Sequence, residues 1–458
     1  MKYLQARRKF CNSSRVSSRQ IIIVGGGAAG FFAAIAAAEA GATVTLLEKS
    51  ARFLDKVRIS GGGRCNVTHA CFEPNEFATR YPRGERALLA PFRKFSARDT
   101  VEWFSARGVA LKTESDGRMF PVTDNSQTIV DCLMNAAQNA GVKLRLNCMV
   151  EAIAKTADGK FELTIASRGA APVPVLEGRQ ASGGNEASHP GPLPVGRGEG
   201  GDSTSTKISA DKLLLATGGC RAAAAGQLAV ALGHQLEPPV PSLFTFQIES
   251  AWLRSLAGVS LALAEVAVPA AQLRERGPLL VTHWGLSGPA VLKMSAWGAR
   301  TLHGLDYRFT LFVNWLPEFS ATKITEEFQA RRQAAGARLV VNVPLSPLTA
   351  RLWEQLVLAA GIARDRRWSA LTRAEMHALG QQLTRSEFPV TGKSLNKDEF
   401  VTCGGVKLKE VDFKTMESRV CPGLFFAGEL LDVDGITGGF NFQAAWTTGF
   451  IAGRAMAA

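Results

Sequence analysis

Residues 21–48 read IIIVGGGAAGFFAAIAAAEAGATVTLLE, and this stretch decides the fold. A β-branched run leads into a glycine turn, and a helix of small residues and a second apolar run follow. Gly25, Gly27 and Gly30 give G-x-G-x-x-G where the first strand turns into the helix, and Glu48 ends the second run. The pattern predicts a dinucleotide site with the pyrophosphate at the helix N-terminus and Glu48 at a ribose diol.

A transmembrane helix is the alternative for residues 21–38, because these 18 residues carry no charge. Three successive glycines and the nearby Glu39 argue against it. No other uncharged apolar run approaches membrane length, so we expect no spanning segment.

The chain is long enough, at 458 residues, for two or three domains. A hydrophobic fraction of 46% and a charged fraction of 20% are typical of a soluble globular protein. The eight cysteines form no C-x-x-C pair, and the six histidines show no metal-binding spacing. These patterns argue against a disulfide framework or a bound metal and favour a reducing cytoplasm.

The net charge of +13 favours a polyanionic partner, either RNA or an acidic membrane surface. Residues 1–20 contribute +6 of this charge and include no acid. They have no apolar segment, so they are not a secretory signal. We expect a disordered basic extension; a transit peptide and an over-long start are the alternatives.

A second glycine cluster follows in residues 56–68, KVRISGGGRCNVT. We expect a loop there, rather than a helix or strand, whose backbone approaches a flat or phosphorylated ligand. A simple surface loop is the alternative. Cys65 follows Arg64, so its thiol could have a lowered pKa and act as an acid; a packed, inert cysteine is the other interpretation.

Two further stretches stand out by composition. Residues 80–103 interleave arginines and a lysine with aromatic residues, which is typical of single-stranded RNA binding but also of an amphipathic helix with a basic outer face. Residues 168–206 are rich in Gly, Pro and Ser and show no apolar period, so we expect a disordered insertion. Neither residues 191–198 nor residues 387–394 complete a P-loop.

The middle of the chain changes character twice. Residues 212–219 predict a buried strand that ends in glycines, as in a parallel sheet. From residue 238 strand patterns dominate, and they include THWGLSGP with His283, either a proton donor or a histidine in a structural turn. Helical patterns follow at 321–335, 347–360 and 372–385.

The last glycine-rich stretch covers residues 423–441 and precedes a helix. Glu429 and Asp432 come at the carboxyl end of its strand, and Gly438 and Gly439 open the helix. If that helix N-terminus faces a flavin, its dipole stabilises negative charge on the reduced ring. A plain helix start is the alternative.

Together these segments resemble the BaiN/RdsA family of bacterial NAD(P)/FAD-dependent oxidoreductases. The resemblance covers nearly all of the chain from residue 21 onward, apart from the insertion. Six motifs carry it: VGGGAAG (24–30), SGGGRCNVT (60–68), LATGG (215–219), THWGLSGPA (282–290), TCGGV (402–406) and AGELLDVDGITGGFNFQAA (427–445). His69 stands where the family usually has asparagine, so the role of that position stays open.

The resemblance implies an α/β fold: a Rossmann-like FAD-binding domain interrupted by a β-rich, barrel-like domain that carries a small helical domain. In this sequence the FAD-binding domain takes residues 21–237 and 404–458. The β-rich domain takes 238–316 and 386–403, and the helical domain takes 317–385.

The glycine motifs and the resemblance together predict the residues that contact FAD. They are Gly25, Gly27, Ala28, Ala29, Gly30, Glu48, Lys49, Gly61, Gly62, Gly63, Arg64, Cys65, Asn66, Thr217, Gly218, Gly428, Glu429, Asp432, Gly438, Gly439, Phe440 and Asn441. The chain has no second dinucleotide fingerprint, so we expect NAD(P)H to reach the flavin without a fold of its own.

The implied chemistry is reduction of FAD by NAD(P)H and then of a carbon–carbon double bond conjugated to a carbonyl, while a protein acid protonates the neighbouring carbon. Cys65, His283 and Cys403 are the candidate acids, in that order. Uridine in 23S ribosomal RNA, reduced to dihydrouridine, is the expected acceptor. A small unsaturated carbonyl compound is one alternative, and an RNA-binding assembly factor with structural FAD is another.

Overall fold

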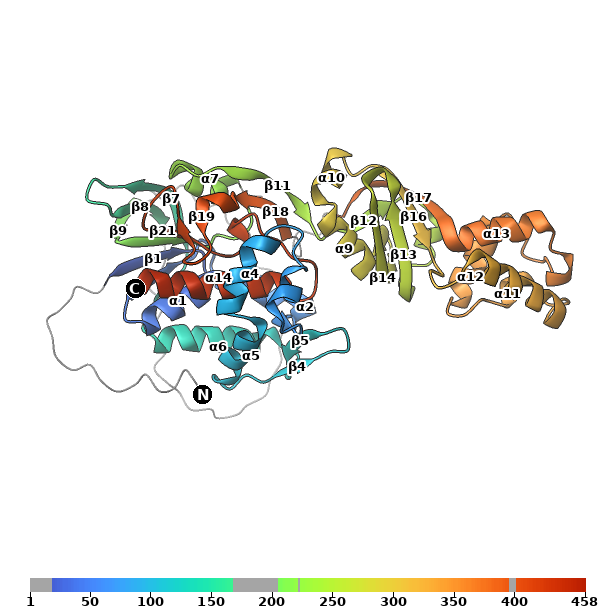
Figure 1. The fold of residues 1–458 in the computed structure, drawn as a ribbon, viewed down its shortest axis with the longest axis horizontal. Helices are drawn as coiled ribbons and strands as arrows, with labels where there is room; N and C mark the ends of the chain where they lie inside the picture. The colour runs from blue at the N-terminus through green and yellow to red at the C-terminus, as the bar shows by residue number, and fades with distance from the viewer. Residues whose placement is uncertain (1–18, 168–204, 221–222, 395–400) are drawn as a thin grey trace, which may run out of the picture.

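The computed structural model describes residues 19–167, 205–220, 223–394 and 401–458. It has three parts in a row: a large α/β part, a barrel, and a group of helices at the far end (Figure 1). The expected basic tail lies almost wholly outside the described residues, and so does most of the expected insertion. Of residues 168–206 only Ser205 and Thr206 are described, and they begin a strand.

The α/β part is built on a seven-stranded sheet in the order β19-β20-β21-β10-β1-β2-β6. Its strands are β1 (Gln20–Val24), β2 (Thr43–Leu47), β6 (Lys143–Arg145), β10 (Lys212–Leu215), β19 (Val411–Asp412), β20 (Glu417–Ser418) and β21 (Leu424–Phe426). The strands from β21 to β6 run parallel. Residues 21–24 are all buried, as expected for a parallel strand that is covered on both faces.

Four neighbouring parallel strands end at the same level. Val24 pairs with Leu47 on one side and with Leu215 on the other, and Leu215 pairs with Phe426. Each strand is followed by glycines or an acid, so this register brings four distant pieces of the chain to one edge. Ligands of open α/β sheets bind outside this carboxyl edge.

Helices α1 (Ala28–Glu39) and α14 (Phe440–Ala457) lie side by side against the sheet (Figure 1). A Cβ on Gly449 would lie 2.4 Å from the Ala29 carbonyl oxygen, and a Cβ on Gly453 would lie 2.3 Å from that of Ala33. Only glycine permits this approach, and the order of the pairs makes the helices parallel. α14 therefore extends beyond the N-terminus of α1 by about eight residues, or about 12 Å at 1.5 Å per residue.

The other elements of the α/β part surround this sheet. They are α2 (Asp55–Gly63), α3 (Pro74–Ala78), α4 (Glu85–Lys94), α5 (Ala97–Ser105), α6 (Ser126–Asn139), α7 (Ala223–Ala231), η4 (Leu408–Glu410), η5 (Gly428–Leu430), β3 (Thr68–His69), β4 (Leu111–Thr113), β5 (Arg118–Pro121), β7 (Cys148–Lys155), β8 (Phe161–Ser167) and β9 (Ser205–Ala210). Across the ranges that the structure describes, no helix is long and apolar enough to cross a membrane.

A closed barrel in the order β12-β15-β14-β13-β16-β17 forms the middle part. Its elements are β12 (Phe246–Ile248), α8 (Ala251–Arg254), β13 (Ser260–Val268), η1 (Pro269–Ala271), β14 (Leu273–Thr282), β15 (Gly285–Ser287), α9 (Pro289–Trp297), α10 (Ala299–Gly304), β16 (Phe309–Asn314) and β17 (Ser386–Lys393). The end part consists of α11 (Ala321–Ala334), η2 (Val340–Asn342), α12 (Ala350–Ala359), η3 (Trp368–Ala370) and α13 (Arg373–Arg385). The predicted fold class is confirmed, and the domain boundaries stay a prediction.

A ribbon and an ion pair join the α/β part to the barrel. The ribbon pairs β11 (Leu236–Ser242) with β18 (Val401–Val406). The Arg83 guanidinium makes two hydrogen bonds to the fully buried Asp434 carboxylate, and it also donates to Ser242 Oγ (3.3 Å) and to the Ala296 carbonyl oxygen of α9 (2.5 Å). Ser242 Oγ itself donates to Asp434 (2.7 Å). One arginine thus links both ends of the α/β part to the barrel.

We expect Arg83→Met to lower the free energy of unfolding by about 3–5 kcal/mol, because Asp434 would remain buried without its partner. Burial already raises the pKa of Asp434, and Arg83 is the main group that opposes that rise, with a further contribution from the Ser242 hydroxyl. A raised carboxyl pKa reduces stability once the pH exceeds the unfolded-state value of about 4. The deficit, measured by urea denaturation, should therefore be smaller at pH 5 than at pH 8.

The control is Arg80→Met, which removes an exposed pair with Glu76. Surface pairs contribute about 0–1 kcal/mol, so this variant should stay near the wild type. Equal losses in the two variants would contradict the role given to Arg83.

Candidate functional site

The first glycine turn has the geometry that its sequence predicts. A Cβ on Gly25 would lie 2.3 Å from the Ala216 carbonyl oxygen, and one on Gly30 would lie 1.9 Å from the Gly25 oxygen. Gly27, by contrast, faces open space at the N-terminus of α1, just before Ala28 and Ala29. Two of the glycines thus permit close packing, and the third leaves room beside the free N–H groups of the helix.

Glu48 follows β2 at the same edge. Its Oε2 accepts a hydrogen bond from the Gly26 N–H (2.8 Å), and its Oε1 accepts one from the Ser50 N–H (2.9 Å). The carboxylate is held beside the glycine turn, and each oxygen keeps a further lone pair for a hydroxyl. Lys49 is exposed to solvent.

A buried polar atom at this edge is left without a hydrogen-bond partner. Thr217 Oγ1 follows β10, and among the described residues nothing bonds to it. The adjacent Gly218 has φ +79° and faces open space. Buried hydroxyls in proteins are almost always paired, so this one indicates a partner that the chain does not supply. The residues present therefore fit a dinucleotide that lies across the carboxyl edge.

The segment 56–68 is not a loop throughout, as was predicted, because residues 56–63 belong to α2. Ser60, Gly61 and Gly62 break the helical conformation, and residues 61–63 all have positive φ. Gly62 and Gly63 face open space, whereas Gly61 lies against Phe120.

Arg64 and Cys65 both turn away from the open side of this segment. The Arg64 guanidinium stacks on Phe120, 4.0 Å from the ring centre, and pairs with Glu114 at 2.6 Å. Cys65 is fully buried, and burial raises the pKa of its thiol to about 12. A thiol in this environment keeps its proton at neutral pH instead of having the lowered pKa that its neighbour Arg64 suggested.

Asn66 and the residues after it tie this segment to the start of α14. With its side-chain amide oriented so that the nitrogen donates to the Thr68 carbonyl oxygen (3.1 Å), Asn66 accepts a hydrogen bond from the Gly439 N–H (2.9 Å). Two residues on, Thr68 Oγ1 donates to Gln443 Oε1 (2.7 Å), and Trp446 Nε1 donates to the Val67 carbonyl oxygen (2.9 Å). The two glycine-rich ends of the chain thus meet through buried hydrogen bonds.

The N-terminus of α14 is enclosed by aromatic rings. Gly438 and Gly439 have positive φ, and a Cβ on Gly439 would collide with the Thr68 backbone. Phe440 is buried and stacks on His69 at 4.9 Å. The side chain of Asn441 exchanges two hydrogen bonds with the Gly435 backbone, so it shapes the turn before the helix.

His69 is held in one tautomer. Its Nδ1 accepts from the Cys71 N–H (3.1 Å), so its Nε2 carries the hydrogen and donates to the Asp116 carbonyl oxygen (3.1 Å). Burial is the main cause that lowers its pKa. The ring is therefore a neutral spacer beside Phe440.

The acids after β21 take different partners. The Gly428 N–H donates to Thr448 Oγ1 on α14 (3.0 Å). Glu429 accepts from Lys56 Nζ (2.6 Å) and from the Thr402 N–H (2.9 Å). Asp432 faces Arg300 of the barrel at 3.2 Å, and burial raises its pKa.

The three candidate acids do not share one environment. Cys403 is buried between Val240 and Ala299, and burial raises the pKa of its thiol to about 11. His283 is exposed in the turn between β14 and β15. The neighbouring Trp284 donates from Nε1 to Thr245 Oγ1 (3.4 Å), just before β12, so this turn adjoins the link between the α/β part and the barrel.

The stretch 80–103 is an amphipathic pair of helices rather than a stacking surface for bases. The rings of Tyr81, Phe92 and Phe95 are buried, and the Trp103 ring packs against the buried Phe32, with 4.5 Å between the ring centres. Its aromatic residues stabilise the core, which was the second interpretation of this pattern.

Several residues that position the site were not predicted from the sequence, notably Lys56, Arg83, Gln443 and Thr448. Gln443 and Thr448 could have been found as polar residues in an otherwise apolar final helix, whereas Lys56 and Arg83 lie outside it and had no such signal.

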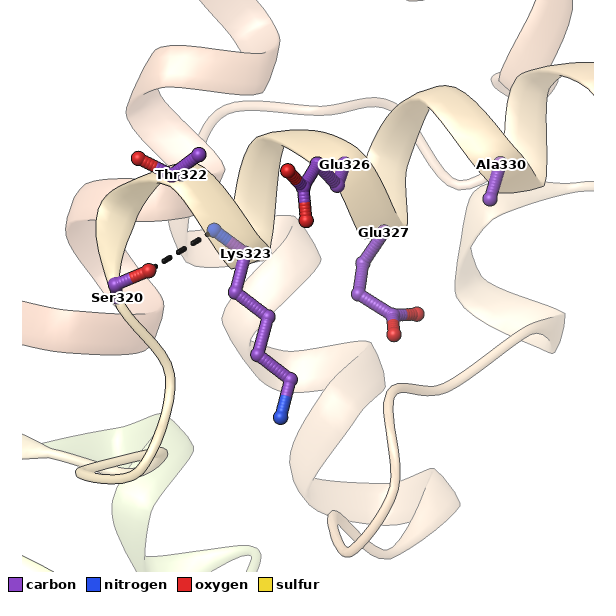
Figure 2. A pocket seen from close by; sticks show the side chains of 6 residues that line it. All are labelled: Ser320, Thr322, Lys323, Glu326, Glu327 and Ala330. Atoms are coloured by element: carbon purple, nitrogen blue, oxygen red, sulfur yellow. Dashed lines mark hydrogen bonds between the residues drawn. The ribbon is translucent and has the colours of Figure 1, made fainter.

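Two surface hollows lie elsewhere. One is on α11, lined by Ser320, Thr322, Lys323, Glu326, Glu327 and Ala330 (Figure 2). The other is lined by Lys94, Lys414, Phe450, Ile451, Arg454 and Ala455. Neither includes a residue predicted to contact the cofactor.

Two family models match two stretches of the chain. Residues 19–188 match the HI0933-like protein Rossmann domain, and residues 240–401 match the HI0933-like protein barrel and H2TH domain. The ribosomal RNA dihydrouridine synthase of Escherichia coli (strain K12) is 29% identical, over 90% of this chain and 91% of the relative.

The 3-dehydro-bile acid delta(4,6)-reductase of Clostridium scindens is 28% identical, over 92% of this chain and 94% of the relative. Among solved structures, 3-ketosteroid-delta4-(5alpha)-dehydrogenase from Rhodococcus jostii RHA1 superposes with a TM-score of 0.49 at 14% identity, covering 97% of this chain and 98% of that one. The family resemblance that the motifs indicated is confirmed. The chain belongs to the HI0933-like protein family and is an oxidoreductase.

Proposed function

We propose that the chain binds FAD and uses NAD(P)H to reduce an activated carbon–carbon double bond, with uridine in 23S ribosomal RNA as the acceptor. The observation that carries the proposal is the meeting of residues 60–68 with the start of α14 beside the carboxyl edge of the sheet. The likeness to ribosomal RNA dihydrouridine synthases along nine-tenths of the chain supports the choice of acceptor.

In this proposal the N-termini of α1 and α14 bind different parts of FAD. The N-terminus of α1, with Gly27 open beside it, suits a pyrophosphate, and Glu48 suits the adenosine ribose. The N-terminus of α14 lies about 12 Å further along, where its partial positive charge suits the pyrimidine end of a flavin. The buried hydroxyl of Thr217, just after β10 at the same carboxyl edge, provides a hydrogen-bonding group.

Hydride transfer from NAD(P)H to a conjugated double bond is the chemistry that FAD supplies when bound. The chain must then deliver a proton to the neighbouring carbon. Cys65 and Cys403 retain their protons at neutral pH, but both thiols are fully buried. His283 is exposed beside the link to the barrel, so we assign the proton donor to this residue.

A small unsaturated carbonyl compound is the second candidate acceptor. The specific observation in its favour is the 28% identity to a bile acid reductase over nearly the whole chain. This reaction uses the same hydride and proton steps. It does not require the net charge of +13.

The acceptor is tested by mixing the purified protein with NADPH and an unmodified transcript of 23S ribosomal RNA. We expect mass spectrometry of the RNA to find uridine converted to dihydrouridine, while a parallel reaction with a 3-dehydro-delta(4,6) bile acid stays slow. Turnover of the steroid with unchanged RNA would favour the second candidate. Failure of NADPH to bleach the flavin would favour an RNA-binding factor in which FAD is structural.

Gly27→Val should abolish FAD binding and leave the protein folded. Gly27 is extended (φ −92°) and a Cβ there meets nothing, so we expect a change in unfolding free energy within about 1 kcal/mol. The added side chain would fill the space beside the helix N-terminus. The measurements are visible absorbance after incubation with FAD and the melting temperature. Gly30→Ala is the contrasting variant, because its Cβ would collide with backbone and lower the stability as well.

His283→Ala should lower kcat for RNA reduction about 100-fold, within the usual contribution of a general acid, and should leave the rate of flavin bleaching by NADPH unchanged. His377→Ala, at an exposed histidine of the helical part, is the matched control and should match the wild type in both assays. A full kcat in His283→Ala would remove this histidine from the mechanism.

A further inference from the structure

The most concentrated positive charge in the described chain lies in the helical part, far from the carboxyl edge. Residues 331–338 and 364–373 contain seven arginines and one aspartate, a net charge of +6 in 18 positions. The two segments lie against each other, because Leu339 forms a β-bridge with Arg367 and the Trp368 N–H donates to the Arg338 carbonyl oxygen (3.1 Å). The charges therefore gather at one junction.

Three of these arginines have acidic partners and four do not. Arg331 pairs with Glu327, Arg364 with Glu354 and Arg366 with Glu375. Within the ranges that the structure describes, the other four guanidinium groups have no hydrogen-bond, ion-pair or ring partner, and all four residues are exposed. They form the distal arginine cluster: Arg332, Arg338, Arg367 and Arg373.

We propose that the distal arginine cluster is a second docking surface for the RNA substrate and holds its phosphate backbone while the target base lies at the carboxyl edge. The inference rests on the proposed RNA acceptor. The cluster belongs to the helical part and the dinucleotide edge to the α/β part, and the barrel lies between these two parts (Figure 1). A small substrate cannot touch both, whereas a polynucleotide can.

The composition of the surface favours phosphate over other partners. A guanidinium group can donate two parallel hydrogen bonds to two oxygens of one phosphate. An arginine that has no acidic partner need not first break an ion pair with a carboxylate. Among the described residues, none of the exposed large hydrophobic side chains belongs to the two segments. A membrane-inserting face or a protein interface normally has such side chains at its centre. RNA is therefore the class of partner that the cluster fits.

The test compares three full-length, FAD-loaded proteins: the wild type, a variant with Arg332→Gln, Arg338→Gln, Arg367→Gln and Arg373→Gln, and a control. The control carries Lys143→Gln, Lys155→Gln, Lys160→Gln and Lys207→Gln, an equal loss of charge from exposed lysines of the α/β part. Each protein is titrated against an unmodified transcript of 23S ribosomal RNA over a series of salt concentrations, and flavin bleaching by NADPH is recorded.

We expect the arginine variant to bind the transcript at least about tenfold more weakly at about 0.1 M salt. The slope of log affinity against log salt should fall by about 3, since each lost phosphate contact contributes roughly 0.7–0.9. The lysine control should retain its affinity within about twofold, and flavin bleaching should be equal in all three proteins.

Equal RNA affinity in the arginine variant and the wild type would overturn the docking surface, and the RNA acceptor would stand if the wild type still forms dihydrouridine. A wild type that neither binds nor reduces the transcript would overturn both proposals. Each protein is also mixed with vesicles of phosphatidylglycerol. Loss of vesicle binding in the arginine variant, with RNA binding intact, would identify a membrane contact and overturn the inference.

Discussion

The close approach of α1 and α14 is the constraint on which the site depends. Gly449 and Gly453 let the last helix lie directly on the backbone of the first one, and any side chain there would separate them. Parallel packing places two helix N-termini in the same direction, one ahead of the other. A long ligand with negative charge near both ends can then interact with both helix dipoles at once.

Buried hydrogen bonds fix the position of residues 66–68 along α14. Asn66, Val67 and Thr68 bond to three successive turns of α14, so the glycine cluster before them cannot shift along the helix. The register of the sheet adds a third constraint, because it ends β21, β10, β1 and β2 at one level. Segments hundreds of residues apart therefore act as one rigid edge.

Sequence patterns predicted most of the framework, because G-x-G-x-x-G after a strand has few structural solutions. They were less reliable where several segments compete for one side chain. Arg64 next to Cys65 suggested a thiol with a lowered pKa. In the structure the Arg64 guanidinium pairs with Glu114, and the Cys65 thiol is buried, which raises its pKa. Interleaved basic and aromatic residues in 80–103 allowed either base stacking or an amphipathic helix, and the rings packed into the core. In both cases the environment of the side chain depends on residues that are close in space but distant in the sequence. A local sequence pattern does not contain this information.

The ribbon of β11 and β18 has an evolutionary consequence. Ser242 pairs with Val401, so the chain leaves the α/β part and returns to it within one strand spacing of about 5 Å. Everything between these two residues behaves like a cassette inserted into a hairpin. Such a cassette can be lengthened, exchanged or diverge in sequence without moving the strands that carry the glycine edge. During evolution the inserted barrel and helical parts can therefore change while the glycine-rich edge of the sheet is conserved.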